Sequence, residues 1–133
     1  MSSRMLSLDE IEKMTVKALI DSGALPKSAK SMGRAVRAAE RDGIRSHGLL
    51  YVPTYCEHLQ CGKVDGKAVP KVIKSRLSSI KVDAKMGFAH PAIDLGFKKI
   101  FPLVKSNGCV GITINNSYNC GVLGFHVERL AEL

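Results

Sequence analysis

Cys109-Val110-Gly111-Ile112-Thr113-Ile114, followed by the polar turn Asn115–Gly121, is the stretch that decides the fold. Its short apolar run is rich in β-branched residues, which favours a strand. A helix is predicted before it, from about His90 to Lys105, with Pro91 in the first turn and Pro102 distorting the end. Asn107-Gly108 should end this helix, and a last helix should run from the polar turn to Leu133. Strands that alternate with helices indicate an α/β layer.

Two more strands are predicted earlier in the chain, at Val69–Ser75 and Ser79–Ala84, with Leu77-Ser78 near their turn. This hairpin is strongly basic. Asp83 is the one acid between residues 67 and 85, against six basic residues: Lys67, Lys71, Lys74, Arg76, Lys81 and Lys85. The pattern is typical of a solvated sheet edge protected by lysines. An electrostatic role for these charges is the alternative.

The first half of the chain is predicted to be helical. Ser7 and Glu10 form a capping box for a helix that ends at Gly23, and a second helix should run from Pro26 to Gly43. A third should extend from about His47 to Leu59, capped by Ser46 and bent near Pro53.

The predicted fold class is therefore α/β (α+β), a helical unit followed by a small mixed sheet with covering helices. We divide the chain into a helical unit, residues 1–65, and the start of an α/β cofactor or substrate domain, residues 66–133. The final helix has no capping glycine and no polar tail, which predicts a chain cut inside this second domain.

Composition narrows the class of protein. The 133 residues suffice for one domain with a hydrophobic core, and 45% hydrophobic with 24% charged residues is ordinary for a globular protein. The four cysteines contain no CxxC pair and lack histidines at zinc spacing, so reduced thiols and no metal are expected. Met1–Leu8 lacks the apolar run of a signal peptide and nothing resembles a membrane span, so we expect a cytoplasmic protein.

The first candidate site lies in Asp42-Gly43-Ile44-Arg45-Ser46-His47-Gly48-Leu49. At a loop-to-helix junction, Ser-His-Gly would place an imidazole beside unpaired backbone N–H groups, and Gly48 would leave room for a ligand. The positive helix end favours neutral imidazole and attracts anions. Neutral imidazole can donate a hydrogen bond to a carbonyl oxygen, as a reductase needs when hydride arrives. A surface or capping histidine is the alternative.

The second candidate site, Asn115-Asn116-Ser117-Tyr118-Asn119-Cys120-Gly121-Val122-Leu123-Gly124, follows the best strand. Open α/β sheets bind ligands where strands end. Gly121 and Gly124 lie at the start of a helix that could hold a phosphate or carboxylate. The stretch is not a GxGxxG motif, and a simple capping turn is the alternative.

Together the two stretches resemble the type-2 malate/L-lactate dehydrogenases, through Asp-Gly-x-x-Ser-His-Gly-Leu, then Pro-x-Tyr, Leu-x-x-Gly and Asn-Ser. The resemblance runs from Leu8 to Leu133. That family includes reductases of ureidoglycolate, diketogulonate and cyclic imino acids. The resemblance implies hydride transfer between NAD or NADP cofactors and a small 2-keto or 2-hydroxy acid. It also implies homodimers and a non-Rossmann cofactor domain, with most nucleotide contacts beyond residue 133.

Carried over by position, the resemblance assigns candidate roles in this sequence. The catalytic candidates are His47 as proton donor, Ser46 and Asn119; the substrate-binding candidates are Tyr55, Tyr51 and Arg45; the cofactor-binding candidates are Asn116, Ser117 and Gly121. Two positions depart from the family pattern. Tyr51 stands where the family usually has an arginine, which would bind a carboxylate bidentately. Asn119 stands where it has a second histidine, and an amide exchanges no proton near neutral pH.

Two other functions stay open at this stage. The net charge of +8 and the arginines of the second helix would suit a basic module that binds nucleic acid or protein. Few aromatic residues and no helix-turn-helix spacing argue against nucleic acid. The two departures would also suit a pseudoenzyme that keeps the family fold without its chemistry.

Overall fold

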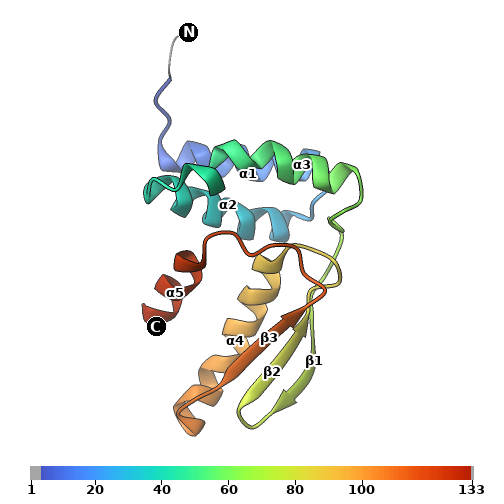
Figure 1. Cartoon of the computed structure of the whole chain (residues 1–133), viewed down its shortest axis with the longest axis vertical. Coiled ribbons are helices and arrows are strands. Elements are labelled where there is room, and N and C mark those ends of the chain that lie inside the picture. Colours follow the sequence, from blue (N-terminus) through green and yellow to red (C-terminus); the bar gives the residue numbers. More distant parts are fainter. Residues whose placement is uncertain (1–3, 133) are drawn as a thin grey trace.

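The computed structural model describes residues 4–132 and has two parts (Figure 1). The helical unit contains three α-helices: α1 (Leu8–Asp21), α2 (Pro26–Arg41) and α3 (Val52–Gln60). The second part contains a three-stranded sheet with two further helices: β1 (Lys71–Arg76), β2 (Ser79–Asp83), α4 (Ala89–Asn107), β3 (Gly111–Asn115) and α5 (Leu123–Ala131). This architecture confirms the predicted fold class.

The helical unit starts at the predicted capping box. Ser7 Oγ accepts a hydrogen bond from the Glu10 N–H at 3.2 Å, and the Glu10 carboxylate accepts one from the Ser7 N–H at 2.8 Å. The backbone bond from Ser7 holds the pKa of Glu10 below its usual value. Gly33 then lets α2 approach α1, because a Cβ there would lie 2.7 Å from Val16 Cγ2. The buried core of this unit includes Leu19, Met32 and Tyr55.

The predicted start of the third helix, near His47, was wrong. Two short 3₁₀ turns, η1 (Arg45–His47) and η2 (Leu49–Tyr51), replace its first residues. The helix α3 begins at Val52, so Pro53 lies in its first turn, where a missing N–H costs nothing, and bends nothing. Ser46 caps no helix. The two turns meet at Gly48, whose extended ψ of −145° interrupts helical geometry.

The sheet has the order β1-β2-β3, with β1 antiparallel and β3 parallel to β2. The helix α4 connects β2 to β3 and covers one face of the sheet, as Figure 1 shows. Ile80 and Val82 of β2 pack there against Ala92 and Phe97 of α4. Gly96 permits this close approach, since a Cβ there would lie 3.2 Å from Ile112 Cγ2. The β2–α4–β3 unit therefore brings the ends of β2 and β3 together.

The remaining boundaries differ from the predictions for local reasons. The strand β1 starts at Lys71 because Pro70, just before it, has no N–H to pair. The helix α4 continues through the exposed Pro102 to Asn107, and Gly108, with φ of 73°, ends it. The last helix, α5, ends at Ala131, while Leu133 lies outside the described residues.

Hydrogen bonds connect α5 with α2 of the helical unit and with α4 of the second part. Asp94 of α4 accepts hydrogen bonds from Ser31 at 2.6 Å, Arg34 at 2.7 Å and Arg129 at 2.6 Å. These partners come from α2 and α5, so Asp94 is a junction of three helices.

The predicted domain boundary at residue 65 stays a prediction. Phe88, which lies beyond this boundary, packs into the core of the helical unit. Among the helices within residues 4–132, none is both long and apolar enough to cross a bilayer.

Candidate active site

The turn that carries His47 presents side chains rather than backbone groups. Ser46 is exposed and His47 is half-buried. The Ser46 hydroxyl lies 3.0 Å from His47 Nδ1. The other ring nitrogen, Nε2, does not have this partner. Arg45, in the same turn, is exposed. The sequence-predicted trio therefore lies on a single short element, η1.

The expected anion cradle of backbone N–H groups is not present at this turn. The His47 N–H donates to Ile44 O at 3.0 Å and the Gly48 N–H to Arg45 O at 3.2 Å. The Leu49 N–H donates to Glu40 Oε1 at 2.7 Å. The same carboxylate fills the space beside Gly48, where a Cβ would clash with Glu40 Oε1. Gly48 thus makes room for Glu40 rather than for a ligand, which corrects the prediction.

An aromatic chain leads from His47 into the core. The rings of His47 and Tyr51 are stacked with centroids 6.2 Å apart, and Tyr51 meets the edge of Tyr55 at 4.8 Å. Tyr55 in turn lies 6.2 Å from the ring of Tyr118. Tyr55 is only 2% exposed, and burial raises the pKa of its hydroxyl to about 12. It is a core residue that supports Tyr51 and Tyr118, and not the open pocket wall that its motif position implied.

The loop between β3 and α5, residues 116–122, uses its first amide for its own shape. Asn116 adopts φ of 50°, a left-handed conformation that asparagine tolerates better than most residues. Its side-chain amide donates to Asp83 Oδ1 at 3.1 Å, and its carbonyl accepts from the Met86 N–H at 2.7 Å. The hydrogen bond from the Lys85 N–H is the main cause that holds the pKa of Asp83 below its usual value, and other hydrogen bonds add to it. Asn116 therefore fixes the end of β3 against β2.

The rest of this loop leaves a small set of groups exposed. Asn119 Oδ1 accepts a hydrogen bond from the Gly121 N–H at 3.1 Å, so this amide also shapes the loop. Ser117 is exposed and, among residues 4–132, forms no hydrogen bond through its hydroxyl. Val122 provides no side-chain cap to α5. The groups available to a ligand are thus the Ser117 hydroxyl, the Asn119 NH₂ group and the first N–H groups of α5.

Two buried histidines under the loop escaped the sequence analysis. His90 is 1% exposed, and a Cβ on Gly121 would lie 3.2 Å from its Nε2. Neither of its ring nitrogens has a hydrogen-bond partner within the described residues. His126 lies beside it, with ring centroids 5.1 Å apart, and its Nε2 is 2.8 Å from the Cys120 carbonyl oxygen. Burial lowers the pKa of His90 to about 3 and also lowers that of His126.

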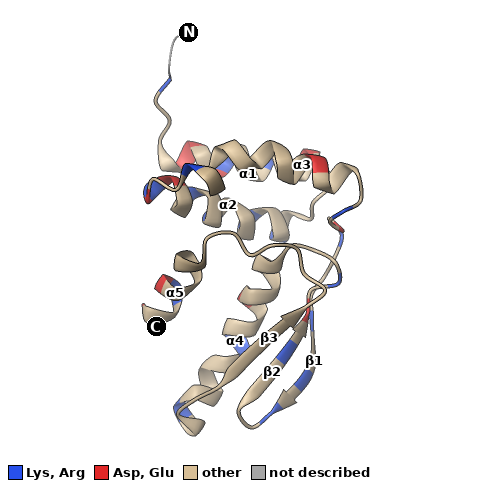
Figure 2. Cartoon of the chain, viewed as in Figure 1, with Lys and Arg blue, Asp and Glu red and all other residues tan. Residues whose placement is uncertain are grey.

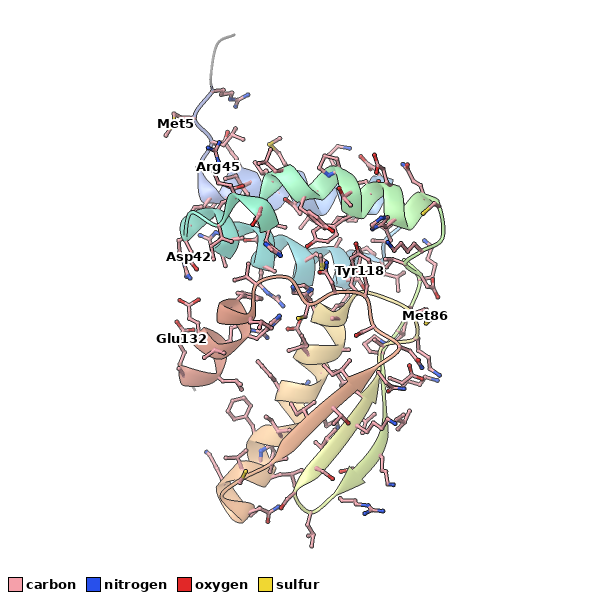
Figure 3. The ribbon with its side chains drawn as sticks, in the orientation of Figure 1. Met5, Asp42, Arg45, Met86, Tyr118 and Glu132 are labelled. Atoms are coloured by element: carbon pink, nitrogen blue, oxygen red, sulfur yellow. The ribbon has the colours of Figure 1, made fainter. Side chains whose placement is uncertain are left out.

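The sequence-predicted residues are brought together only in part. Tyr118, from the loop, contacts Tyr55 and His58 of α3, and His58 Nδ1 is 2.6 Å from the Tyr118 hydroxyl. Its ring also meets Phe88, which precedes α4 and packs into the core of the helical unit. Burial, followed by the neighbouring Tyr51 hydroxyl, raises the pKa of Tyr118. The loop and η1 are therefore joined through the tyrosines. Figure 3 shows Arg45 at the α2 end of the helical unit, well away from Tyr118.

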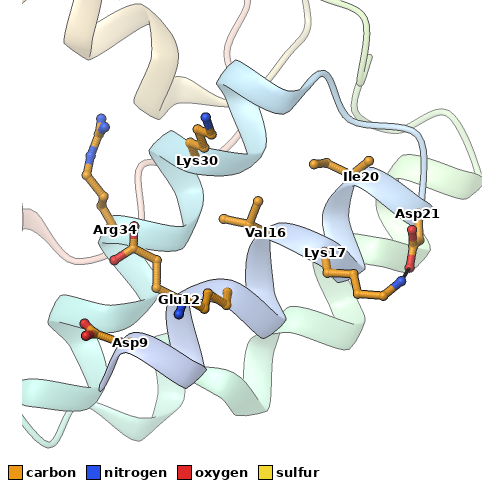
Figure 4. Close-up of a pocket in the computed structure, with 9 residues that line it drawn as sticks. Asp9, Glu12, Val16, Lys17, Ile20, Asp21, Lys30 and Arg34 are labelled. Atoms are coloured by element: carbon orange, nitrogen blue, oxygen red, sulfur yellow. Dashed lines mark hydrogen bonds and ion pairs between the residues drawn. The ribbon is translucent and has the colours of Figure 1, made fainter. Parts of the chain in front are cut away.

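A hollow of about 610 Å³ lies away from these residues, between α1 and α2 (Figure 4). Its floor contains Val16 and Ile20, and its rim mixes acids and bases such as Glu12 and Lys30. None of the sequence-predicted site residues lines it.

The arginines of α2, which suggested a basic binding module, are paired with acids. Arg37 lies 3.1 Å from Asp9, and Arg41 lies 2.7 Å from Glu128. The third, Arg34, bonds to Asp94. Because each guanidinium already has a carboxylate partner, these three arginines offer little uncompensated charge to nucleic acid.

Comparison with known proteins agrees with the sequence pattern. The family model for malate/L-lactate dehydrogenase matches residues 6–133. The (2R)-3-sulfolactate dehydrogenase (NADP(+)) of Chromohalobacter salexigens is 43% identical over 130 residues, covering 98% of this chain and 39% of that protein. Delta(1)-pyrroline-2-carboxylate reductase 1 of Burkholderia ambifaria is 29% identical over 126 residues, covering 95% of this chain and 37% of that protein.

Solved structures show the same fold. The malate dehydrogenase of Pyrococcus horikoshii superposes with a TM-score of 0.88 at 22% identity, covering 97% of this chain and 37% of that one. The sulfolactate dehydrogenase of Methanocaldococcus jannaschii gives 0.85 at 22% identity, covering 95% and 37%. The chain thus spans less than two-fifths of the length of these proteins. With the family model matched from residue 6 onward, the chain belongs to the malate/L-lactate dehydrogenase family.

Proposed function

We propose that this chain is the N-terminal part of an oxidoreductase that reduces a small 2-keto acid, or the related cyclic imine, with NADH or NADPH. The names of its relatives support this class, since one acts on sulfolactate with NADP(+) and another reduces pyrroline-2-carboxylate. The observation that carries the proposal is the contact between Ser46 and His47 Nδ1 at 3.0 Å, on an exposed turn of the family fold.

In this proposal His47 supplies the proton. Reduction of a carbonyl adds hydride to its carbon and a proton to its oxygen. Protonated His47 gives the proton from Nε2, while its Nδ1–H donates to the Ser46 hydroxyl oxygen. That bond favours the tautomer that remains after the transfer, which keeps the proton on Nδ1. Ser46 is therefore a positioning residue.

The acid group of the substrate needs a cation in this scheme. Arg45 is the candidate, because it is exposed two residues from His47 and forms no ion pair with a carboxylate in residues 4–132. A guanidinium binds a carboxylate or sulfonate through two parallel hydrogen bonds. Tyr51, stacked beside His47, adds a hydroxyl and an apolar face.

The loop before α5 fits one polar part of a nicotinamide cofactor. Ser117, the NH₂ group of Asn119 and the first N–H groups of α5 form a donor set suited to a phosphate or amide group. Asn116 and Gly121, proposed as cofactor contacts, act through the loop's shape, because the Asn116 amide and the Gly121 N–H are already bonded. The cofactor supplies hydride when bound.

The test is an assay of NADH and NADPH oxidation with pyruvate, oxaloacetate, sulfopyruvate and pyrroline-2-carboxylate. His47→Ala should lower the rate by roughly 10²–10⁴, the usual loss for a general acid. Ser46→Ala should lower it by about 2- to 10-fold, as expected for one lost hydrogen bond. Gln60→Ala is the control, because it removes an exposed polar side chain of the neighbouring α3 and should leave the rate nearly unchanged.

Two outcomes would reject parts of the proposal. Full activity in His47→Ala would remove His47 from the mechanism. Cofactor binding without turnover of any acid would instead favour a pseudoenzyme, in keeping with Asn119 and Tyr51.

We also propose a cytoplasmic homodimer. The exposed apolar side chains of α5, Leu123, Val127 and Leu130, support a subunit contact, and light scattering would test it.

A further inference from the structure

The face of the sheet opposite α4 carries an unusual group of cations. In β2, Ile80 and Val82 point to α4, so the alternating Ser79 and Lys81 lie on the open face. Their partners across the ladder are Arg76 and Lys74 on β1. All four side chains are exposed. Figure 2 shows the basic segments of the two strands on neighbouring parts of the sheet.

A bulge in β1 places Lys74 on this face. The pairing shifts between Val72 and Lys74, so the strand gains one residue at that point. Val72 packs toward α4, and without the bulge Lys74 would share its face. With the bulge, Lys74 lies opposite Lys81 instead. Bulges of this kind re-aim a side chain, and they recur near functional sites.

The sheet itself gains nothing from this arrangement. Like charges placed directly opposite each other on neighbouring strands are destabilising. No carboxylate pairs with Lys74, Arg76 or Lys81 anywhere in residues 4–132. Protection of sheet edges by lysine, the role suggested by the sequence, can apply to β1 but not to Lys81, because β2 is the central strand.

The three cations surround a shallow hollow. It has a volume of about 210 Å³ and is lined by Lys74, Arg76, Ser79, Ile80, Lys81 and Thr113. Thr113 of β3 is the ladder partner of Lys81. The hollow thus combines three positive charges with the hydroxyls of Ser79 and Thr113. Ile80 also borders the hollow, although its side chain packs toward α4, and no aromatic ring on which a base could stack lines it.

We propose that this hollow binds a phosphate group of a small molecule. A phosphate offers two negative charges and several acceptor oxygens, which match the guanidinium, the two ammonium groups and the two hydroxyl donors. Its charge would remove the repulsion between Lys74 and Lys81. The absence of a stacking ring argues for recognition of the phosphate rather than of a base. The site is independent of the proposed dehydrogenase function.

The test is a calorimetric titration of the whole chain with inorganic pyrophosphate and with inorganic phosphate, against sodium chloride at matched ionic strength. Saturable binding of the phosphates is expected. Lys81→Met should weaken it by about tenfold or more, the scale of one lost charge-assisted hydrogen bond. This variant relieves the like-charge pair, so it should fold at least as well as the parent. Lys99→Met, on an exposed position of α4, removes an equal charge and should leave binding unchanged.

Three results would overturn the proposal. Binding no stronger than that of chloride would show that the hollow is only a solvated surface. Equal losses in Lys81→Met and Lys99→Met would show a general charge effect. Tight binding of random-sequence duplex DNA, lost steeply with salt and in Lys81→Met, with no saturable pyrophosphate binding, would assign the surface to nucleic acid instead.

Discussion

The turn Arg45–Tyr51 contains a histidine, His47, whereas the loop at residues 116–122 covers one, His90. The surroundings of the two imidazole rings differ. In the turn, Glu40 and local carbonyls satisfy the backbone, and the half-buried His47 ring has only the Ser46 hydroxyl as partner. In the loop, asparagine side chains satisfy the backbone, and His90 lies fully buried beneath it with no partner among the described residues.

This difference shows that the surroundings of a residue, and not its type, determine what it can do. Burial makes His90 a neutral packing group, whereas the half-buried His47 lies on a surface turn with the Ser46 hydroxyl beside its Nδ1. The turn therefore offers side-chain chemistry, and the loop offers mainly the first N–H groups of α5.

Replacing Tyr55 should have the largest effect, because its ring connects the turn to the loop through Tyr51 and Tyr118. Tyr55→Ala should lower the free energy of unfolding by about 3–5 kcal/mol, as for other buried aromatic rings. Tyr55→Phe keeps the ring and should cost less than about 1.5 kcal/mol. Urea denaturation measures both. A loss below about 1 kcal/mol for Tyr55→Ala would show that the ring contributes little packing.

Acid should destabilise the loop region through His90. Its folded pKa of about 3 lies below the ordinary value of 6.5, so the unfolded chain binds an extra proton below pH 6.5. The free energy of unfolding should fall by about 1.4 kcal/mol per pH unit as the pH drops through this window. His90→Leu should remove that contribution and cost little at pH 7, since no hydrogen bond is lost. An unchanged pH slope in His90→Leu would contradict the assignment.

The turn should respond to a methyl group at Gly48. In Gly48→Ala the Cβ would displace the Glu40 carboxylate and leave the Leu49 N–H without its acceptor. We expect a loss of about 1–3 kcal/mol in the free energy of unfolding. In a double-mutant cycle with Glu40→Ala, the two losses should be strongly non-additive. Additive losses would mean that the carboxylate and the glycine act separately.

The smallest effect should come from the loop's own amide. Asn119→Ala removes the acceptor for the Gly121 N–H and should cost about 0.5–1.5 kcal/mol. Ser117→Ala, two residues away, should leave stability unchanged and weaken cofactor binding instead. The pair separates Asn119, which shapes the loop and also offers a donor, from Ser117, which only offers a donor. A stability loss in Ser117→Ala and none in Asn119→Ala would exchange their roles.

Much of the fold could be predicted from local patterns. The capping box at Ser7 and the apolar run of β3 each encode their element within a few residues. The start of α3 could not, because it depends on Glu40 reaching across to Gly48 from a different helix. The bulge before Lys74 likewise depends on strand pairing that the pattern of β1 does not show.

The candidate site followed the same division. Motif order located Ser46, His47 and the Asn-Ser loop. It did not reveal that Tyr55 is buried or that His90 lies under Gly121, because burial is a property of the assembled helices. A histidine followed by Pro91 and an apolar helix face was the one available sign of His90.

The most direct test of the account is whether the turn and the loop respond to ligand as one site. We would follow the ring resonances of His47 and the backbone amides of Ser117 and Leu123 by NMR while adding NADPH together with oxamate, a non-reducible keto-acid analogue. If the turn and the loop form one site, both groups should shift with a single dissociation constant, and Arg45→Ala should weaken binding at both. Shifts confined to one region, or saturating at separate concentrations, would contradict a shared active site.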